Sequence, residues 1–286
     1  MAQHYIISLS SIPPRFHQLE STLQSLLAQT VPARNIILYL NRSYRRFPDW
    51  DGQPPNVPDG VEIRWVEEDY GPATKVLPAV KEFSGQDIDI LFCDDDQEYR
   101  PNLAERLLAA RLRRPNDALA VSGMQDYDAL PGTKRQFDRN PRRLYLWKAT
   151  NVAYRIGTVW NDLASKMFGR PRKELARRLI LRPGYADGFE GWMGVMVRPE
   201  FFPPEVFDIP EFAWPVDDVW LSGHLMRQGH GAWIVGGFFE PILQPIMKAA
   251  HGDNQALFKS EFDGKDRHVL NAEAARYFQD TYGIWL

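Results

Sequence analysis

The first 124 residues alternate short apolar runs with stretches of helical periodicity. Apolar runs of strand length stand at Tyr5–Leu9, Ile36–Leu40, Ile88–Phe92 and Ala118–Val121, and Val61–Trp65 alternates apolar with polar residues. Continuous apolar runs are typical of strands buried on both faces, whereas strict alternation indicates a half-exposed strand. The pattern therefore predicts five strands in this half of the chain.

Leucines between these strands recur at the spacing of amphipathic helices. One set follows the breaker pair Pro13-Pro14 and consists of Phe16, Leu19, Leu23, Leu26 and Leu27. The other follows Asn102, has Glu105 in the place of a capping-box acid, and consists of Leu103, Leu107, Leu108 and Leu112. Strands that alternate with helices build a mostly parallel central sheet flanked by helices. We therefore predict an α/β fold that binds ligands beyond the carboxyl ends of its strands.

The pattern loosens after Gly123 into a basic and aromatic region. Strand character returns at Trp192–Val197 and at Trp233–Val235. We interpret a break near Met124 as a division between two halves, residues 1–124 and 125–286, of one continuous domain rather than as a flexible linker.

Composition excludes several classes of protein. The chain has 286 residues, of which 44% are hydrophobic and 25% charged, which is ordinary for a globular protein and excludes whole-chain disorder. Its net charge of −3 gives no indication of a nucleic-acid partner. The charge is uneven, however, because residues 134–182 hold 14 Lys or Arg against 3 Asp or Glu. This basic segment is either a solvated helix face or a surface for anionic lipid head groups or an anionic acceptor.

Cysteine content and hydropathy bear on the compartment. Cys93 is the single cysteine, so neither an intramolecular disulfide nor a Cys-x-x-Cys zinc site can form. No run approaches the roughly 18–20 apolar residues of a membrane span, and no basic n-region precedes an apolar run at the start. We expect a cytoplasmic protein, with the inner face of the membrane as the place where the basic segment would act.

Three adjacent carboxylates, Asp94, Asp95 and Asp96, directly follow the predicted strand Ile88–Phe92. Such carboxylates repel one another, which raises the pKa of at least one of them unless a cation offsets the charge. Mn²⁺ or Mg²⁺ would do so, because these ions take one or two protein carboxylates and complete their shell with substrate phosphates. The alternative is a solvated acidic turn before the next helix.

Three stretches of sequence resemble those of a known family: "FCDDD", "ISLSSIPPRFHQLESTLQSLLAQ" and "WPVDDVWLSGHL". They are similar to glycosyltransferases of the GT-A fold, closest to the bacterial family 2-like enzymes. The resemblance implies a Rossmann-like nucleotide-diphospho-sugar transferase fold, with residues 1–124 binding the nucleotide-sugar and 125–286 binding the acceptor and supplying catalysis. It also implies a DXD motif in which Asp94 and Asp95 face the nucleotide-sugar and Asp96 ligates the metal.

Polar residues at the first strand's end suit the diphosphate of a nucleotide. Ser8, Ser10 and Ser11 offer hydroxyl groups, and Arg15 can bind phosphate oxygens with its planar guanidinium. A plain helix start is the other interpretation. The second strand ends at Asn41, where family 2 enzymes usually carry an Asp-Asp pair, so recognition of uracil by a carboxylate is not implied at that position.

The stretch Asp69-Tyr70-Gly71-Pro72-Ala73-Thr74-Lys75 follows the third strand. We expect a turn at Gly71-Pro72 and then a helix opened by Thr74 and Lys75, whose amino end and ammonium group favour an anion. Related bacterial enzymes carry a similar Gly-Pro-x-Thr-Lys element near the nucleotide. A turn with a solvated lysine is the alternative.

The segment Trp214–Trp220 offers an acid pair between aromatic residues. An inverting transfer needs a carboxylate that removes the proton of the acceptor hydroxyl, and aromatic faces hold sugars. By resemblance Asp218 is the general base, with Asp217 as the alternative, and the predicted acceptor-binding residues are Trp192, Trp214 and Trp220. An acidic cap on a helix at Val219–Gln228 is the other interpretation.

Two weaker signals complete the resemblance. Gly191–Val195 resembles the glycine-rich strand that lines the acceptor cleft in GT-A enzymes, although close backbone approach would explain its glycines as well. His251 lies where such enzymes often place a metal-ligating histidine, and a structural or solvated histidine is the alternative.

Together these features predict a metal-dependent, inverting glycosyltransferase. It would move a sugar from a nucleotide-sugar, UDP-linked by resemblance, to a glycan or glycolipid acceptor in cell-surface polysaccharide synthesis. A sugar-nucleotidyltransferase is the second hypothesis, but no glycine-rich phosphate loop follows the first strand. A carbohydrate-binding protein is the third, and it leaves the aspartate triplet without a role.

Overall fold

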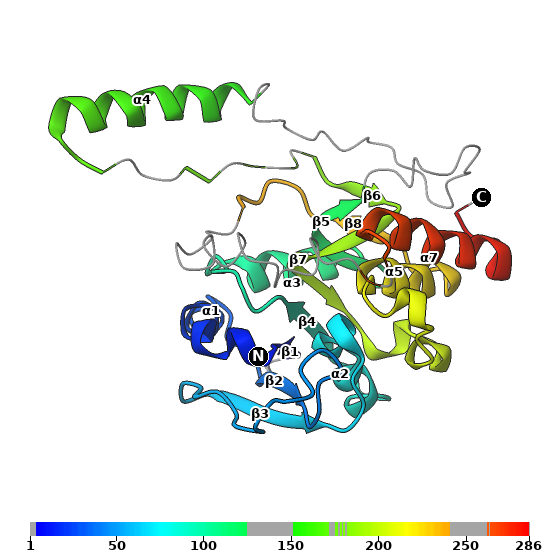
Figure 1. Ribbon diagram of the computed structural model, residues 1–286. Coiled ribbons are helices and arrows are strands. Elements are labelled where there is room, and N and C mark those ends of the chain that lie inside the picture. Colours follow the sequence, from blue (N-terminus) through cyan, green and yellow to red (C-terminus); the bar gives the residue numbers. More distant parts are fainter. Residues whose placement is uncertain are drawn as a thin grey trace.

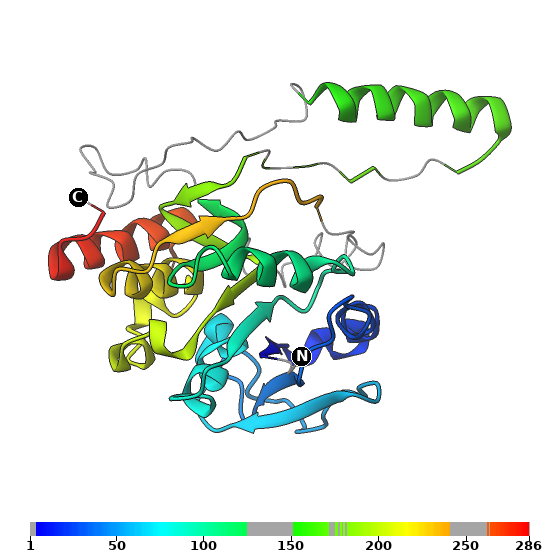
Figure 2. The same cartoon turned by 180° about the vertical axis from the view of Figure 1, so that it is seen from behind.

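The computed structural model describes residues 4–124, 151–171, 175–176, 178, 180, 182–240, 262 and 264–285. Its centre is an eight-stranded sheet in the order β3-β2-β1-β4-β7-β5-β8-β6, flanked by helices (Figures 1 and 2). Within this sheet β6 and β7 run opposite to the other strands. The predicted α/β class with a mostly parallel sheet is confirmed.

The strands follow the predicted apolar runs to within a few residues, and β6 is an addition that the pattern did not predict. They are β1 (Tyr5–Ser10), β2 (Ile36–Asn41), β3 (Val61–Val66), β4 (Asp89–Cys93), β5 (Ala118–Met124), β6 (Gly184–Ala186), β7 (Gly188–Val197) and β8 (Ala232–Ile234).

Helices cover both faces of the sheet, and α4 and α7 were not predicted. The α-helices are α1 (Leu19–Leu27), α2 (Leu77–Glu82), α3 (Leu103–Arg111), α4 (Val152–Phe168), α5 (Asp217–Arg227) and α7 (Arg267–Tyr282). The 3-10 helices are η1 (Pro13–Gln18), η2 (Gly71–Lys75), η3 (Pro199–Phe201), η4 (Pro204–Phe207) and η5 (Glu211–Ala213).

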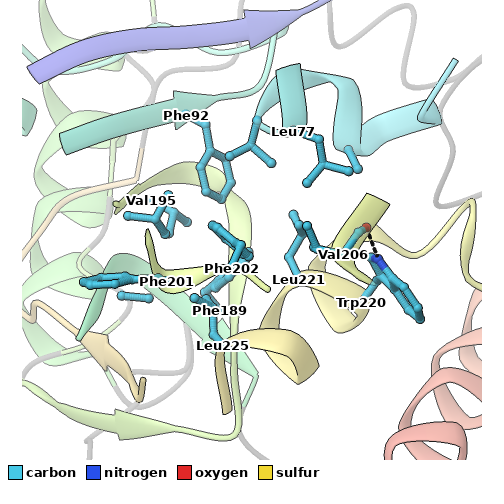
Figure 3. Close-up of a cluster of buried hydrophobic side chains, with 14 of the residues drawn as sticks. Leu77, Phe92, Phe189, Val195, Phe201, Phe202, Val206, Trp220, Leu221 and Leu225 are labelled. Atoms are coloured by element: carbon cyan, nitrogen blue, oxygen red, sulfur yellow. Dashed lines mark hydrogen bonds between the residues drawn. The ribbon is translucent and has the colours of Figure 1, made fainter. Parts of the chain in front are cut away.

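Successive residues of each central strand serve two separate cores, because side chains alternate across a sheet. Leu91 packs in the core beneath α1 and α3, whereas Phe92 packs in the core beneath α2, α5 and α7. Figure 3 shows the second core, where Phe92 meets Phe189 with ring centroids 5.5 Å apart. Burial on both faces explains why β1, β2 and β4 read as continuous apolar runs.

The strand β7 joins the two halves of the chain. It lies between β4 and β5 and is antiparallel to both, with Phe92 opposite Val195 and Ser122 opposite Glu190. Residues on both sides of Met124 therefore belong to one sheet. The same insertion brings the amino-terminal part of β7 beside the carboxyl end of β4, where the aspartate triplet begins.

Two predicted helix starts are corrected by the structure, and a third is confirmed. Thr74 and Lys75 end the 3-10 helix η2 rather than open a helix, and α2 begins only at Leu77. The helix α5 begins at Asp217, two residues before the predicted start, so its two aspartates lie in the first turn and make no side-chain cap. The helix α3 begins at Leu103 with Asn102 as its cap residue, as predicted. The Asn102 side chain makes no cap hydrogen bond, and Glu105 accepts one from Thr30 rather than completing a capping box.

Two features concern the surface. No helix in the described part of the chain has both the length and the apolar character needed to cross a membrane. The helix α4 projects away from the sheet and its covering helices in both views (Figures 1 and 2). Much of the basic segment, including residues 134–150, lies outside the described residues.

Candidate functional site

A cavity of about 610 Å³ lies beyond the carboxyl ends of β1, β2 and β4. This is the edge at which open α/β sheets bind ligands. Fourteen of the residues predicted from the sequence line it: Ser10, Ser11, Arg15, Asn41, Asp69, Thr74, Lys75, Asp94, Asp95, Asp96, Trp192, Trp214, Asp217 and Asp218. Residues more than 200 positions apart in the sequence thus meet in one cavity.

Two predicted site residues in the described part of the chain do not line this cavity. Ser8 is buried beneath it, and its hydroxyl donates to the backbone oxygen of Lys75 at 2.7 Å. Trp220 lies in the second core, where its indole nitrogen donates to the oxygen of Val206 at 2.8 Å (Figure 3). Both side chains are fully buried and lie outside the cavity lining, so neither can contact a sugar directly. His251 lies outside the described residues.

The middle aspartate of the triplet, Asp95, is bonded within the protein and connects two loops of the site. Asp95 is buried and accepts a hydrogen bond from Ser11 at 2.5 Å and one from Arg15 at 2.7 Å. Its backbone oxygen accepts from Thr22 of α1 at 3.1 Å. The loop after β1 is therefore fixed to the loop after β4, and the Arg15 guanidinium is held at the cavity wall with its charge maintained by Asp95, which raises its pKa.

The third aspartate carries charge that the protein offsets only in part. Asp96 lies 3.4 Å from Arg15 and accepts a hydrogen bond from Gln97 at 3.1 Å. Burial, and then the neighbouring charges of Asp95 and Asp94, raise its pKa to about 7. A cation bound next to Asp96 would lower that pKa and stabilise the ionised carboxylate.

Lys75 links the two acidic groups of the site. Its ammonium lies 2.7 Å from Asp94, 3.0 Å from Asp217 and 4.0 Å from Asp218. Burial alone would lower the pKa of Lys75, but these three carboxylates outweigh burial and raise it well above its ordinary value. Its ammonium is thus charged and occupied within the protein, which corrects the expectation that it stands ready for an anion at a helix amino end.

The two aspartates of α5 have different surroundings. Asp217 is 3% exposed and lies between Lys75 and Arg267, the latter at 3.9 Å. Asp218 is 17% exposed and accepts a hydrogen bond from the Gly191 amide at 3.1 Å. Burial and then the Asp217 charge raise the pKa of Asp218 to about 7. Asp218 is therefore the carboxyl group of the pair that can exchange a proton with a ligand near neutral pH.

A second corner of the cavity is built around Asp69. This side chain accepts hydrogen bonds from Asn41 at 3.0 Å and from the Gly71 amide at 2.8 Å. The Trp214 indole donates to the backbone oxygen of Asp69 at 3.0 Å, and its ring would clash with any side chain at Gly71, which has a φ of +59°. Trp214 therefore fixes the turn after β3 while one part of it lines the cavity.

The structure adds three charged residues that the sequence motifs missed. Arg46 lines the cavity, and its buried Nη1 atom has no hydrogen-bond partner among the described residues. Burial and then the nearby charge of Arg15 lower the pKa of Arg46, and the charge of Asp69 offsets this only in part. Glu190 and Arg267 also line the cavity. The basic run at Arg42–Arg46 was a usable signal for the first of these, but nothing local marked Glu190 or Arg267.

The charge of the lining favours a small cation together with an anionic ligand. Seven carboxylates and four cationic side chains line the cavity. No group of three or more His, Cys, Asp or Glu side chains in the described part of the chain is arranged to hold a metal ion. Asp95 and Asp94 each lie 2.7 Å from a cationic nitrogen, whereas Asp96 lies 3.4 Å from Arg15. Asp96 is therefore the carboxylate of the triplet whose charge is least compensated. This donor set fits an ion such as Mg²⁺ or Mn²⁺ only if phosphate oxygens or water complete its shell.

Comparisons with known proteins find similarity among solved structures. No protein-family model and no curated protein matches the chain. Among solved structures, the chain is similar to the crystal structure of S. aureus TarS 1–349 in complex with UDP, with 12% identity and a TM-score of 0.40. The match covers 82% of this chain and 59% of that one, so the chain spans less than two thirds of it.

Gly191 offers a test of how tightly the Lys75 group is packed. A Cβ atom at this position would lie 2.7 Å from the Lys75 ammonium and 2.9 Å from a carboxylate oxygen of Asp218. We expect Gly191→Ala to displace both groups and to lower kcat by about tenfold or more, because small misplacements of reacting groups are costly. The thermal midpoint should fall only slightly. Gly229→Ala adds a Cβ atom in open space at a glycine with a φ of +82°, so it should strain the backbone and lower the thermal midpoint while it leaves kcat unchanged. A Gly191→Ala enzyme with unchanged kcat would show that the position of Lys75 and Asp218 is not critical.

Proposed function

We propose that this protein is a metal-dependent glycosyltransferase of the GT-A type that uses a nucleotide-diphospho-sugar. One observation carries the proposal. A single cavity at the carboxyl edge of the sheet holds the partly compensated carboxylate of Asp96, the guanidinium groups of Arg15 and Arg46, and the proton-accepting carboxyl of Asp218. Metal, diphosphate and general base are the three requirements of a metal-assisted, inverting glycosyl transfer.

The arginines supply the diphosphate end of the donor site. Arg15 is held at the wall by Asp95, and Arg46 has a buried nitrogen without a partner among the described residues. Phosphate oxygens would accept from both guanidinium groups, which bind phosphate in a bidentate geometry. Asn41, Asp69 and Thr74 line the same cavity and would contact the nucleoside or the sugar. The proposal that the donor sugar is linked to UDP rests on the resemblance alone.

Asp218 supplies the base for the transfer. Its ionised carboxylate takes the proton of the acceptor hydroxyl while that oxygen forms a bond to the anomeric carbon of the donor sugar. The bond from the anomeric carbon to the diphosphate oxygen breaks at the same time, and the charge of the leaving diphosphate falls on Arg15 and Arg46. Attack from the face opposite the leaving group inverts the anomeric configuration.

A divalent cation completes the donor site in this proposal. Asp96 would hold Mn²⁺ or Mg²⁺, with His251 as a further ligand by resemblance. When bound, such an ion neutralises charge on the diphosphate as it leaves. The chain's own contribution is the placement of Asp96, which is set by the Asp95–Arg15 pair beside it.

Two tryptophans form the acceptor side of the proposed site. Trp192 and Trp214 line the cavity and present aromatic faces that suit a sugar ring. We infer a glycan or glycolipid acceptor and a role in cell-surface polysaccharide synthesis from the resemblance, with contact to an anionic membrane through the basic segment 134–182.

Calorimetric titration with UDP, with and without Mn²⁺, tests the donor site. We expect Mn²⁺ to strengthen UDP binding and Asp96→Ala to remove that gain, a loss of about tenfold to a hundredfold in affinity. The fold should survive, because removing Asp96 relieves repulsion within the triplet. Asp280→Ala changes an exposed aspartate of α7 and serves as the matched control. Unchanged Mn²⁺-dependent affinity in Asp96→Ala would refute the metal role.

The same titrations separate the other two hypotheses. A sugar-nucleotidyltransferase should bind a nucleoside triphosphate more tightly than UDP and release pyrophosphate in the presence of a sugar phosphate. A carbohydrate-binding protein should bind free glycan without nucleotide or metal. Binding of UDP with Mn²⁺, together with release of UDP from a UDP-sugar, is the result that our proposal requires.

A further inference from the structure

The helix α4 (Val152–Phe168) has an apolar face that nothing in the described structure covers. Its exposed hydrophobic residues are Val152, Ile156, Val159, Trp160, Leu163, Met167 and Phe168, each 45–67% exposed. No residue within the helix is buried. Both views show the helix held away from the sheet and its covering helices (Figures 1 and 2). An exposed apolar face of this size marks an interaction site.

The apolar residues form one continuous stripe. Those from Val152 to Met167 follow one another at intervals of one, three or four positions, which places them on a single side of a helix. Polar side chains occupy the other side, among them Thr158, Asp162 and Ser165. Arg155 and Lys166 lie at the border of the stripe. Long basic side chains at such a border can pack their methylene groups on apolar surface and extend their charged ends toward a charged surface.

Local interactions define the two ends of this helix. The Asn151 side chain accepts a hydrogen bond from the Tyr154 amide at 3.1 Å and caps the amino end. Gly169, with a φ of +59°, ends the helix in a left-handed conformation. Leu175 of the returning chain approaches Gly157 at the edge of the stripe. The helix thus has its own start and stop signals and leaves the stripe itself open.

The basic charge of the segment that contains α4 indicates what kind of surface binds the stripe. Residues 134–182, within which α4 lies, carry 14 basic against 3 acidic side chains. A second copy of this chain would bring an equally basic segment against the first, and like charges at close range disfavour that contact. A bilayer surface with anionic head groups attracts the same segment. A helix with Trp160 and Leu163 on one side and basic residues at the border has the character of an interfacial membrane helix.

We propose that α4 lies in the surface of an anionic membrane, with its apolar stripe among the acyl chains and with Arg155 and Lys166, at the border of the stripe, on the head groups. The helix is too short and too polar on one side to cross the bilayer, so it anchors the protein without spanning. The inference rests on the membrane contact proposed above for the basic segment and names α4 as its anchoring element. It does not depend on the proposed transfer reaction.

Co-sedimentation of the full chain with lipid vesicles tests the proposal. We expect binding to vesicles that contain phosphatidylglycerol, weaker binding to vesicles of phosphatidylcholine alone, and a steep loss at high salt. The double variant Val159→Glu/Leu163→Glu should lower the bound fraction by about tenfold or more, because two charges would enter the acyl region. Thr158→Glu/Ser165→Glu adds the same charge on the polar side and should lose far less.

A second readout places the stripe itself in the lipid. Brominated acyl chains should quench tryptophan fluorescence in the wild type, and Trp160→Phe should remove most of that quenching while it keeps vesicle binding. Equal binding by neutral and anionic vesicles, or by the two double variants, would overturn the proposal. So would a wild-type dimer that sediments without vesicles and becomes monomeric in Val159→Glu/Leu163→Glu, which would assign the stripe to a second copy.

The donor site provides an independent check on these variants. UDP binding should be the same in the wild type and in both double variants, because none of the four positions lines the cavity. A protein that binds vesicles as expected but does not bind UDP would refute the proposed function and leave this inference intact. A protein that binds UDP but no anionic vesicle would refute this inference together with the proposed membrane contact, and would leave the proposed transfer reaction intact.

Discussion

Asp218→Asn should abolish sugar transfer while leaving the donor bound. The amide keeps the size of the side chain and an oxygen for the Gly191 amide, now 3.1 Å away, but it cannot take a proton at neutral pH. Loss of a positioned general base costs about 10²–10⁴ in rate, or roughly 3–5 kcal/mol of barrier. Transfer of sugar from a UDP-sugar, followed by the release of UDP, is the measurement, and UDP affinity is the readout that should not change.

The pH profile gives this prediction a second test. Because the raised pKa of Asp218 is about 7, the base is largely protonated and inactive below that pH and ionised above it. The kcat/KM of the wild type should therefore rise about tenfold per pH unit below pH 7 and level off above it. The residual activity of Asp218→Asn should lack this rise.

Asp217→Asn is the matched control for Asp218→Asn. Asp217 is nearly inaccessible and serves as a partner of Lys75, so its replacement should reduce stability more than it reduces the rate. If Asp217→Asn removes turnover and Asp218→Asn does not, the two roles are exchanged. If both variants transfer sugar at the wild-type rate, the acidic pair is structural and the proposed mechanism is wrong.

Lys75→Met should lower the free energy of unfolding by about 3–5 kcal/mol. Loss of one partner from a buried ion pair leaves the opposite charge without compensation, and here three carboxylates, those of Asp94, Asp217 and Asp218, lose a shared ammonium. Denaturant unfolding at pH 7 measures the effect. Lys81→Met replaces an exposed lysine of α2 and should change stability by less than about 0.5 kcal/mol.

A double variant shows whether charge is the cause. Adding Asp217→Asn to Lys75→Met removes one of the uncompensated carboxylates and should restore part of the lost stability. Such recovery is a coupling between neighbours that independent sites do not show. A double variant whose loss equals the sum of the two single losses would mean that Lys75 stabilises the protein by packing alone.

The sequence by itself determined the architecture and most of the cavity lining. Apolar runs predicted β1, β2, β4 and β5 because strands buried on both faces are mostly apolar, and alternation predicted the half-exposed β3. The aspartates after β4 and the acid pair at the start of α5 stood out because adjacent carboxylates need compensation that a local sequence does not provide. Fourteen of the predicted site residues line the cavity for these reasons.

Only the tertiary structure decided which charge compensates which. The sequence places Lys75 at least 19 positions from each of its three carboxylates, and only the insertion of β7 between β4 and β5 lets α5 bring Asp217 and Asp218 to it. Long-range packing likewise excludes Trp220 from the candidate acceptor site, because its indole is buried in the core and donates a hydrogen bond to Val206. Ion pairing and burial depend on distances through space, and a pattern along the chain carries information only about neighbours in sequence.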